Sequence, residues 1–212
     1  MGVRGSGGPY KKNLGPYATV IYQVPLPYEY RGWSTEMALA ALNDLFGSAV
    51  APDRVAAIII EPVLGEGGFV PAPKAFLEQL RALTQKHGIL LIVDEIQSGF
   101  GRTGKFFAIE HSGVSPDLIT VAKSLAAGFP LSGAVGPAEV TDAPGPGGLG
   151  GTYGGHPAAA APGLAVLDPM RAARLPASGA RRGPGLVASH RSRATHPAPR
   201  RPCSAQRTQP RA

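Results

Sequence analysis

Apolar residues gather along this chain in runs whose length and spacing predict alternating strands and helices. Three short runs are apolar at almost every position, which is typical of strands buried in a sheet: 55–60, 89–93 and 118–122. Two longer segments, from Ser34 to about Phe46 and from about Pro73 to His87, carry apolar residues on one helical face. This alternation predicts an α/β domain with a mostly parallel sheet and helices on both faces.

A charged residue follows each predicted strand at its carboxyl end. Glu61 follows the first strand, Asp94 the second and Lys123 the third. Ligands of such sheets bind beyond these ends. A partly desolvated lysine there suits a Schiff-base nucleophile, and a neighbouring carboxylate suits a protonated pyridine nitrogen. The alternative, which the spacing alone leaves open, is that Lys123 and Asp94 face solvent where their loops begin.

Composition changes this picture mainly at the two ends of the chain. Residues 1–30 are rich in Gly, Pro and Tyr without a period, and we expect an irregular segment there. The predicted domain covers 31–169. Residues 170–212 are dominated by Arg, Ala, Pro and Ser, and from 171 onward contain ten arginines and no acid, which predicts a disordered tail. The net charge of +7 therefore comes from this tail, and it does not indicate a nucleic-acid-binding body.

Several classes of protein are not favoured. No apolar run reaches the roughly 18 residues of a membrane span, and the first residues lead into no apolar stretch typical of a secretory signal. The single Cys203 cannot form an internal disulfide, so we expect a cytoplasmic protein. The five histidines lack metal-ligand spacing, so no metal site is predicted. A G-x-G-x-x-G pattern at 145–150 lacks the strand and helix of a dinucleotide site.

Four blocks of sequence carry a more specific pattern. They cover 61–68, 91–104, 117–133 and 147–157, and read EPVLGEGG, LIVDEIQSGFGRTG, DLITVAKSLAAGFPLSG and GGLGGTYGGHP. In this order they resemble the signature of class III aminotransferases, which depend on pyridoxal 5'-phosphate (PLP). The GLGGT wording is most similar to the 4-aminobutyrate aminotransferase branch. The resemblance extends over about residues 10–168 and implies part of the large domain of PLP fold type I.

The resemblance also implies roles in binding the cofactor. Lys123 matches the catalytic lysine that forms the Schiff base with PLP and shuttles the proton. Asp94 matches the partner of the pyridinium nitrogen, which keeps the ring an electron sink. Ile96 falls where an aliphatic side chain packs under the ring, and Gln97 where an amide lies near the 3-oxygen. Thr152 resembles a residue that reaches the phosphate of the neighbouring subunit's cofactor, which implies a homodimer.

Two glutamates are implied in binding substrate. Glu66 resembles the residue that pairs with a substrate-binding arginine and moves aside for an α-carboxylate, and Glu61 matches a glutamate near the substrate amine. As an alternative, Glu66 is a solvated loop acid. Arg102, within Gly-Arg-Thr-Gly, is interpreted as fixing a turn rather than as binding an anion. The implied reaction moves an amino group from an ω-amino compound such as 4-aminobutyrate to a 2-oxo acid.

Parts of the family pattern have no match here. Residues 1–50 match neither the family's phosphate loop nor its ring-stacking aromatic residue, and the match ends near Asp168. We therefore expect an internal fragment, inactive as given, whose tail resembles a shifted reading frame. One alternative is another class III enzyme, such as an ornithine-type transaminase or a semialdehyde aminomutase. Another is a non-catalytic remnant with a basic, polyanion-binding tail. No membrane and no specific nucleic acid is expected as a partner.

Overall fold

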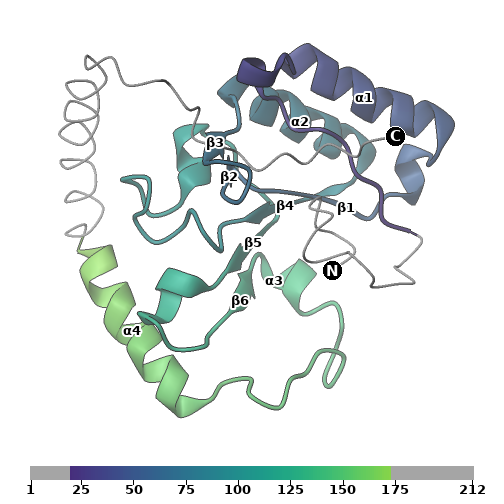
Figure 1. Ribbon diagram of the computed structural model, residues 1–212. Coiled ribbons are helices and arrows are strands. Elements are labelled where there is room, and N and C mark those ends of the chain that lie inside the picture. Colours follow the sequence, from purple (N-terminus) through teal and green to yellow (C-terminus); the bar gives the residue numbers. More distant parts are fainter. Residues whose placement is uncertain (1–19, 173–212) are drawn as a thin grey trace, which may run out of the picture.

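The computed structural model describes residues 20–172, and its centre is a four-stranded sheet. The strands lie in the order β1 (Ala57–Ile60), β4 (Leu90–Asp94), β5 (Leu118–Val121) and β6 (Gly133–Val135) (Figure 1). The first three are parallel, and β6 runs antiparallel to β5. A separate antiparallel pair is formed by β2 (Val63–Leu64) and β3 (Val70–Pro71). The predicted α/β fold with a mostly parallel sheet is confirmed.

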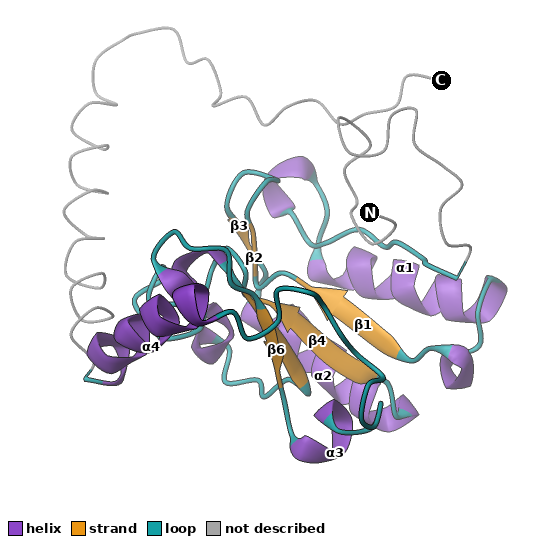
Figure 2. Cartoon of the chain, turned by 90° about the horizontal axis from the view of Figure 1, so that it is seen from below, coloured by secondary structure: helices purple, strands orange, loops and turns teal. Residues whose placement is uncertain are grey.

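Two long helices lie on the same side of this sheet (Figures 1 and 2). Helix α1 (Thr35–Ser48) begins after Ser34, whose hydroxyl accepts a hydrogen bond from the Met37 N–H at 3.2 Å. Helix α2 (Lys74–His87) ends at Gly88, which is left-handed with φ 67°. Both helices were predicted from their apolar faces, and their observed ends differ from the predicted ones by no more than two residues.

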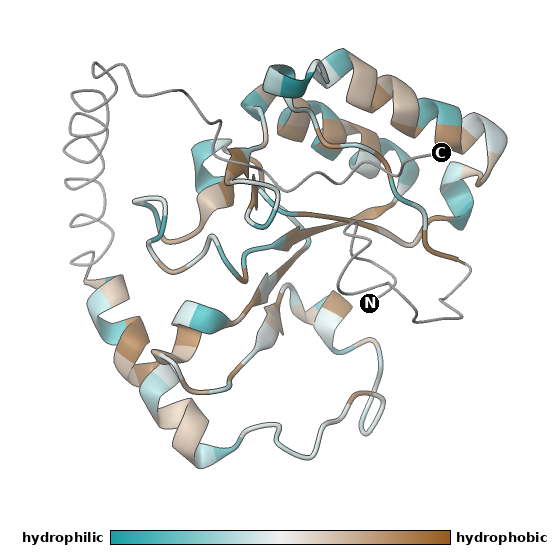
Figure 3. Ribbon diagram, in the orientation of Figure 1, coloured by the Kyte–Doolittle hydropathy of each residue, from teal (hydrophilic) through white to brown (hydrophobic). Residues whose placement is uncertain are grey.

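The hydrophobic core lies between these helices and the sheet. Leu91 and Val93 of β4 are completely buried against α2, whose Leu77 and Leu80 belong to the same cluster. Figure 3 shows the hydrophobic residues concentrated on the central strands. Because side chains alternate along a strand, Leu91 and Val93 point toward the helices, while Asp94 points to the opposite face. The packing of β4 therefore determines where its terminal carboxylate lies.

The remaining helices were not predicted. They are the short helix α3 (Ala138–Thr141), helix α4 (Pro157–Arg171), and four 3-10 helices, η1 (Glu29–Arg31), η2 (Pro52–Arg54), η3 (Ala108–His111) and η4 (Lys123–Ala126). Helix α4 packs against η4, and its Gly163 approaches Leu131 so closely that a Cβ would lie 2.9 Å from a methyl carbon. Within residues 20–172, no helix combines the length and apolarity that a bilayer span requires. Apart from 170–172, the predicted tail lies outside the described residues.

An ion pair joins α2 to the start of β5. Arg81 donates from both terminal nitrogens to the two carboxylate oxygens of Asp117, at 2.6 and 2.9 Å. The same carboxylate accepts a hydrogen bond from the Leu91 N–H at 2.7 Å. The hydrogen bonds from Arg81 are the main reason that the pKa of Asp117 is lowered, and the hydrogen bond from the Leu91 N–H lowers it further. One side chain thus ties a helix and two strands together.

We expect this carboxylate to make stability depend on pH. Because the pKa of Asp117 is lower in the folded chain, its contribution is present above the unfolded pKa and is lost as pH falls through the folded pKa. Asp117→Asn should lower the free energy of unfolding by about 1–3 kcal/mol near neutral pH and flatten the loss of stability in acid. Urea unfolding at several pH values measures this, with the exposed Asp53→Asn as control. If the free energy of unfolding fell equally steeply with decreasing pH in wild type and in Asp117→Asn, Asp117 would not be the cause of the pH dependence.

Candidate active site

Three of the predicted site residues lie at, or directly beyond, the carboxyl ends of parallel strands. Glu61 follows β1 directly, Asp94 is the last residue of β4, and Lys123 is the first residue of η4, two positions after β5. Strand register pairs Asp94 with Thr120 of β5. Parallel pairing therefore brings these strand ends to one edge of the sheet, where ligands of α/β proteins bind.

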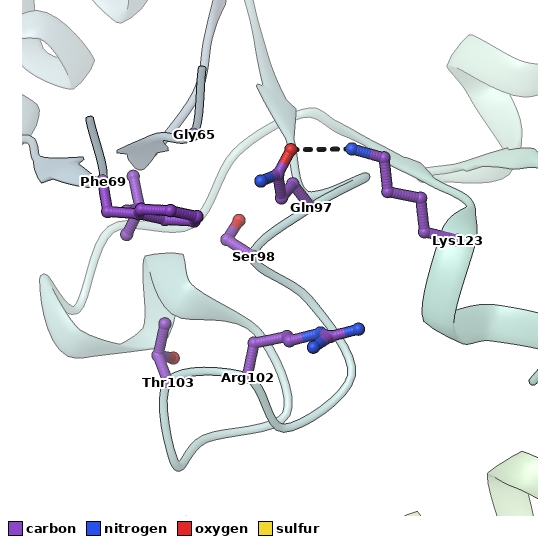
Figure 4. Close-up of a pocket in the computed structure, with 8 residues that line it drawn as sticks. Gly65, Phe69, Gln97, Ser98, Arg102, Thr103 and Lys123 are labelled. Carbon is purple, nitrogen blue, oxygen red and sulfur yellow. Dashed lines mark hydrogen bonds between the residues drawn. The ribbon is translucent and has the colours of Figure 1, made fainter. Parts of the chain in front are cut away.

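The Lys123 amine is directed at Gln97. Its Nζ donates a hydrogen bond to the Gln97 Oε1 at 2.7 Å (Figure 4). Gly65 lies against the other side of this amide, because a Cβ at position 65 would come within 2.7 to 2.9 Å of the Gln97 side chain. The absence of a side chain at Gly65 thus leaves room for Gln97 to reach the lysine.

A cavity of about 340 Å³ opens beside this contact. Eight residues of the described range 20–172 line it, and none of these eight is acidic: Val63, Gly65, Phe69, Gln97, Ser98, Arg102, Thr103 and Lys123. A second cavity, of about 410 Å³, also borders Lys123 and is lined mainly by residues 128–132. The lysine therefore borders two spaces, and its side chain is exposed to both.

Asp94 is half-buried, and it lies next to a threonine hydroxyl that makes no hydrogen bond within residues 20–172. Its Oδ1 accepts a hydrogen bond from the Ile96 N–H at 3.0 Å, which closes the turn after β4. The neighbouring Thr120 hydroxyl is buried and, among residues 20–172, has no hydrogen-bond partner. Residues paired in register on parallel strands point to the same face, so this hydroxyl and the Asp94 carboxylate share one face of the sheet.

Asp94 and the remaining predicted residues are not among the residues that line the two cavities in the described part of the chain. Glu61 accepts a hydrogen bond from the Gly65 N–H at 2.9 Å, so its carboxylate holds the loop that carries Glu66. Glu66 is exposed, and Ile96 is half-buried in the turn after β4. Thr152 is exposed on the segment that joins α3 to α4. The structure brings Lys123 and Gln97 together by a hydrogen bond, and Ile96 directly precedes Gln97 in the chain.

Sequence reasoning missed Glu95, whose side chain is completely buried. The Ser98 hydroxyl donates to its Oε2 at 2.6 Å, and the Ile109 N–H donates to its Oε1 at 2.8 Å. The available signal was a second acid, two positions after the apolar run 89–93, where burial requires hydrogen-bond donors. This carboxylate anchors the turn that carries Gln97 and Ser98 to η3.

Arg102 supports the loop rather than projecting freely. Its Nε and Nη2 donate to the Ser124 Oγ at 3.1 and 3.0 Å. This contact agrees with the interpretation of Arg102 as a residue that fixes a turn, and it connects the loop to the residue after Lys123. The neighbouring Thr103 contacts the His111 ring nitrogen Nε2 through its carbonyl and hydroxyl oxygens, at 3.1 and 3.2 Å.

Comparison with known proteins identifies the family of this chain. The family model described as "Aminotransferase class-III" matches residues 1–189. The chain belongs to the class III aminotransferases. Among curated members, a probable 4-aminobutyrate aminotransferase of Bacillus subtilis is 53% identical over 167 residues, which cover 76% of this chain and 38% of that protein. A 5-aminovalerate aminotransferase of Pseudomonas putida is 50% identical, with 82% of this chain and 41% of that protein covered.

Solved structures of two transaminases share the fold. An amine transaminase from an uncultivated Pseudomonas species, in its PLP-bound form, superimposes with a TM-score of 0.82 at 33% identity, covering 91% of this chain and 47% of that one. The ornithine aminotransferase of Toxoplasma gondii gives a TM-score of 0.79 at 31% identity, covering 93% and 43%. Membership and the PLP-bound neighbour imply PLP as the cofactor of the family. The chain spans 38% to 41% of the length of the two curated relatives.

Proposed function

We propose that this protein is a PLP-dependent aminotransferase that moves an amino group from an ω-amino compound, such as 4-aminobutyrate, to a 2-oxo acid. The observation that carries the proposal is the Lys123 amine, which borders a cavity at the carboxyl end of β5, next to the strand that ends in Asp94. The curated relatives named for 4-aminobutyrate and 5-aminovalerate support the donor class, because both compounds carry the amine at the end remote from the carboxylate.

The residues at this edge of the sheet fit PLP. An aldehyde needs a primary amine, a protonated ring nitrogen needs an anion, and a ring oxygen needs a polar partner; Lys123, Asp94 and Gln97 have these chemistries. The unpartnered Thr120 hydroxyl leaves hydrogen-bonding capacity beside Asp94. A cavity of about 340 Å³ lies within the range of small-molecule sites, roughly 300–1,000 Å³.

Each residue would contribute one task. Bound PLP supplies an aldehyde that binds amines covalently and a ring that accepts the electron pair released at the donor carbon. Lys123 Nζ would hold the cofactor at rest and, once displaced by a donor amine, would move the proton at the donor carbon. The Asp94 carboxylate would keep the ring nitrogen charged, because a nearby anion favours the protonated form. Gln97 would orient the Lys123 amine through the hydrogen bond that it accepts.

The proposal extends to the less direct residues. Ile96 would pack beneath the ring, Glu61 would lie near the donor amine, and Glu66 would pair with a substrate-binding arginine. Thr152 would contact the phosphate of a second subunit's cofactor in a homodimer. Its exposure on the segment between α3 and α4, outside the walls of both cavities, supports a role beyond its own subunit's cavity. We place the enzyme in the cytoplasm.

A second class III activity, of the ornithine type, has weaker support. The resemblance to the ornithine aminotransferase of Toxoplasma gondii covers most of this chain, but at 31% identity. The relatives named for 4-aminobutyrate and 5-aminovalerate reach 53% and 50%. The difference favours an ω-amino acid with a single amine as the donor.

Competition for the cofactor tests this function. The 212-residue chain is loaded with PLP, mixed with a donor, reduced with borohydride and mapped by peptide mass spectrometry. We expect 4-aminobutyrate and 5-aminovalerate to lower the label at Lys123, because their amines displace the lysine, and we expect butyrate to have no effect. Adducts on the exposed Lys105 serve as the internal reference. A loss caused by ornithine alone would favour the ornithine-type enzyme. Equal losses at Lys123 and Lys105 with every amine would show that the proposal is wrong.

A further inference from the structure

The backbone of Lys123 has an unusual conformation. Its φ is 46°, in the left-handed region, and Ala127 at the other end of η4 has φ 51°. A residue with a side chain is strained there by about 1–3 kcal/mol and remains only where its surroundings hold it. Burial does not hold Lys123, because its side chain is exposed. Besides the hydrogen bond from Lys123 to Gln97, contacts of the neighbouring residues maintain this conformation.

Ser124, the next residue, makes one of these contacts through its side chain. The guanidinium of Arg102 donates two hydrogen bonds to the Ser124 Oγ, at 3.1 and 3.0 Å, across a sequence separation of 22 residues. Within η4, the Leu125 N–H donates to the Ala122 carbonyl at 3.0 Å, and Ala126 is completely buried. The strained backbone of Lys123 is thus held by a local turn and by one contact from a distant loop.

The loop that carries Arg102 is itself well held. Gly101 and Gly104 adopt φ values of 84° and 88°, and the Gly104 N–H donates to the Gly101 carbonyl at 3.1 Å. At the base of the loop, the rings of Phe100, Phe106 and Phe107 pack on one another with centroid distances of 4.9 to 5.9 Å. A rigid loop can transmit a fixed position to Ser124, whereas a mobile loop could not.

We propose that Arg102 is a positioning residue for Lys123. By fixing Ser124, it maintains the left-handed backbone that directs the lysine amine along the cavity wall to Gln97. Figure 4 shows Arg102 and Lys123 on adjoining sides of this cavity, with the guanidinium extended toward the backbone of the lysine. Arg102 acts through Ser124, and it needs no contact with cofactor or substrate. The effect of Arg102 on the capture of PLP by Lys123 rests on the function proposed above.

Hydrogen exchange of the chain without cofactor gives a test that is independent of that function. Arg102→Met removes the donors, Ser124→Ala removes the acceptor, and Ser124→Thr retains the hydroxyl. Arg54→Met, an exposed arginine of η2, is the matched control. We expect the Leu125 amide to exchange roughly tenfold faster in Arg102→Met and Ser124→Ala, because a hydrogen bond of charged guanidinium is lost. Ser124→Thr and Arg54→Met should exchange as wild type does. Unchanged exchange at Leu125 in Arg102→Met would overturn the inference.

Capture of PLP at Lys123, relative to Lys105, tests the positioning itself. This ratio should fall about threefold or more in Arg102→Met and in Ser124→Ala, with no further fall in the double variant, because the two residues share one interaction. Ser124→Thr should restore it. A lower melting temperature with an unchanged ratio would make Arg102 merely structural and overturn the inference. A wild-type chain without preference for Lys123 would count against the proposed function, whereas a preference that survives Arg102→Met would count against the positioning role alone.

Discussion

Replacing Lys123 with alanine should abolish the specific covalent capture of PLP by this chain. Within residues 20–172, Lys123 is the one lysine that lines the cavity, and its amine lies 2.7 Å from the Gln97 amide oxygen. Borohydride converts the reversible bond between lysine and cofactor into a permanent one, so the modified peptide identifies the residue. In wild type the label should map to Lys123. In Lys123→Ala it should fall to the background seen on exposed lysines.

Two further variants make this result specific. Lys123→Arg keeps the positive charge but cannot form the Schiff base, so it should fail as alanine does. Lys105→Ala removes the nearest competitor in sequence, an exposed lysine that directly follows Gly104, and should leave the label at Lys123 intact. Mapping of the wild-type label to Lys105 or Lys86 would instead discard Lys123 as the cofactor lysine.

Glu95→Ala should cause the largest loss of stability of any single substitution at the site. The carboxylate is completely buried and accepts hydrogen bonds of 2.6 Å from Ser98 and 2.8 Å from the Ile109 N–H. Alanine would leave both donors without partners and would open a cavity. Together these effects should lower the free energy of unfolding by about 3–5 kcal/mol. The change is measured by urea unfolding followed by circular dichroism.

Conservative and distant variants separate this cause from a general effect of losing an acid. Glu95→Gln keeps an oxygen for the Ile109 N–H and can donate to the Ser98 hydroxyl, so it should cost only about 1–2 kcal/mol. Glu78→Ala removes an exposed acid of α2 that lies 3.6 Å from Lys74, and should change stability by less than about 1 kcal/mol. If Glu95→Ala and Glu78→Ala unfolded at the same urea concentration, the buried hydrogen bonds of Glu95 would not be a major source of stability.

The parts of the fold that were predicted correctly are those whose burial follows a simple period. Leu91 and Val93 belong to a continuous apolar run because β4 is central in the sheet. By contrast, β6 is exposed at all three of its positions and therefore lacks a hydrophobic signal. Helix α4 contains Pro162 and Pro169, which normally argue against a helix interior. Its packing against η4 overrides that local preference.

The same distinction applies to the site. Asp94 and Lys123 could be predicted because strand ends of a parallel sheet meet at one edge, and the family resemblance added Gln97. The contacts that hold these residues could not be found in this way. Arg102 reaches Ser124 over 22 positions, and Glu95 reaches Ile109 over 14. Such pairs depend on the path of loops in space, and no local spacing in one sequence reveals them.

The alternation along β4 also limits how this region can change. Leu91 and Val93 face the helices, and Asp94 faces the other way. Inserting or deleting one residue within β4 would reverse every direction after that point, which would turn the carboxylate toward the core and a valine toward the ligand edge. No single substitution could correct both the misplaced carboxylate and the misplaced valine. Substitutions in β4 can therefore have small or large effects on stability. A change in its length would instead disrupt the core packing and the position of Asp94 together.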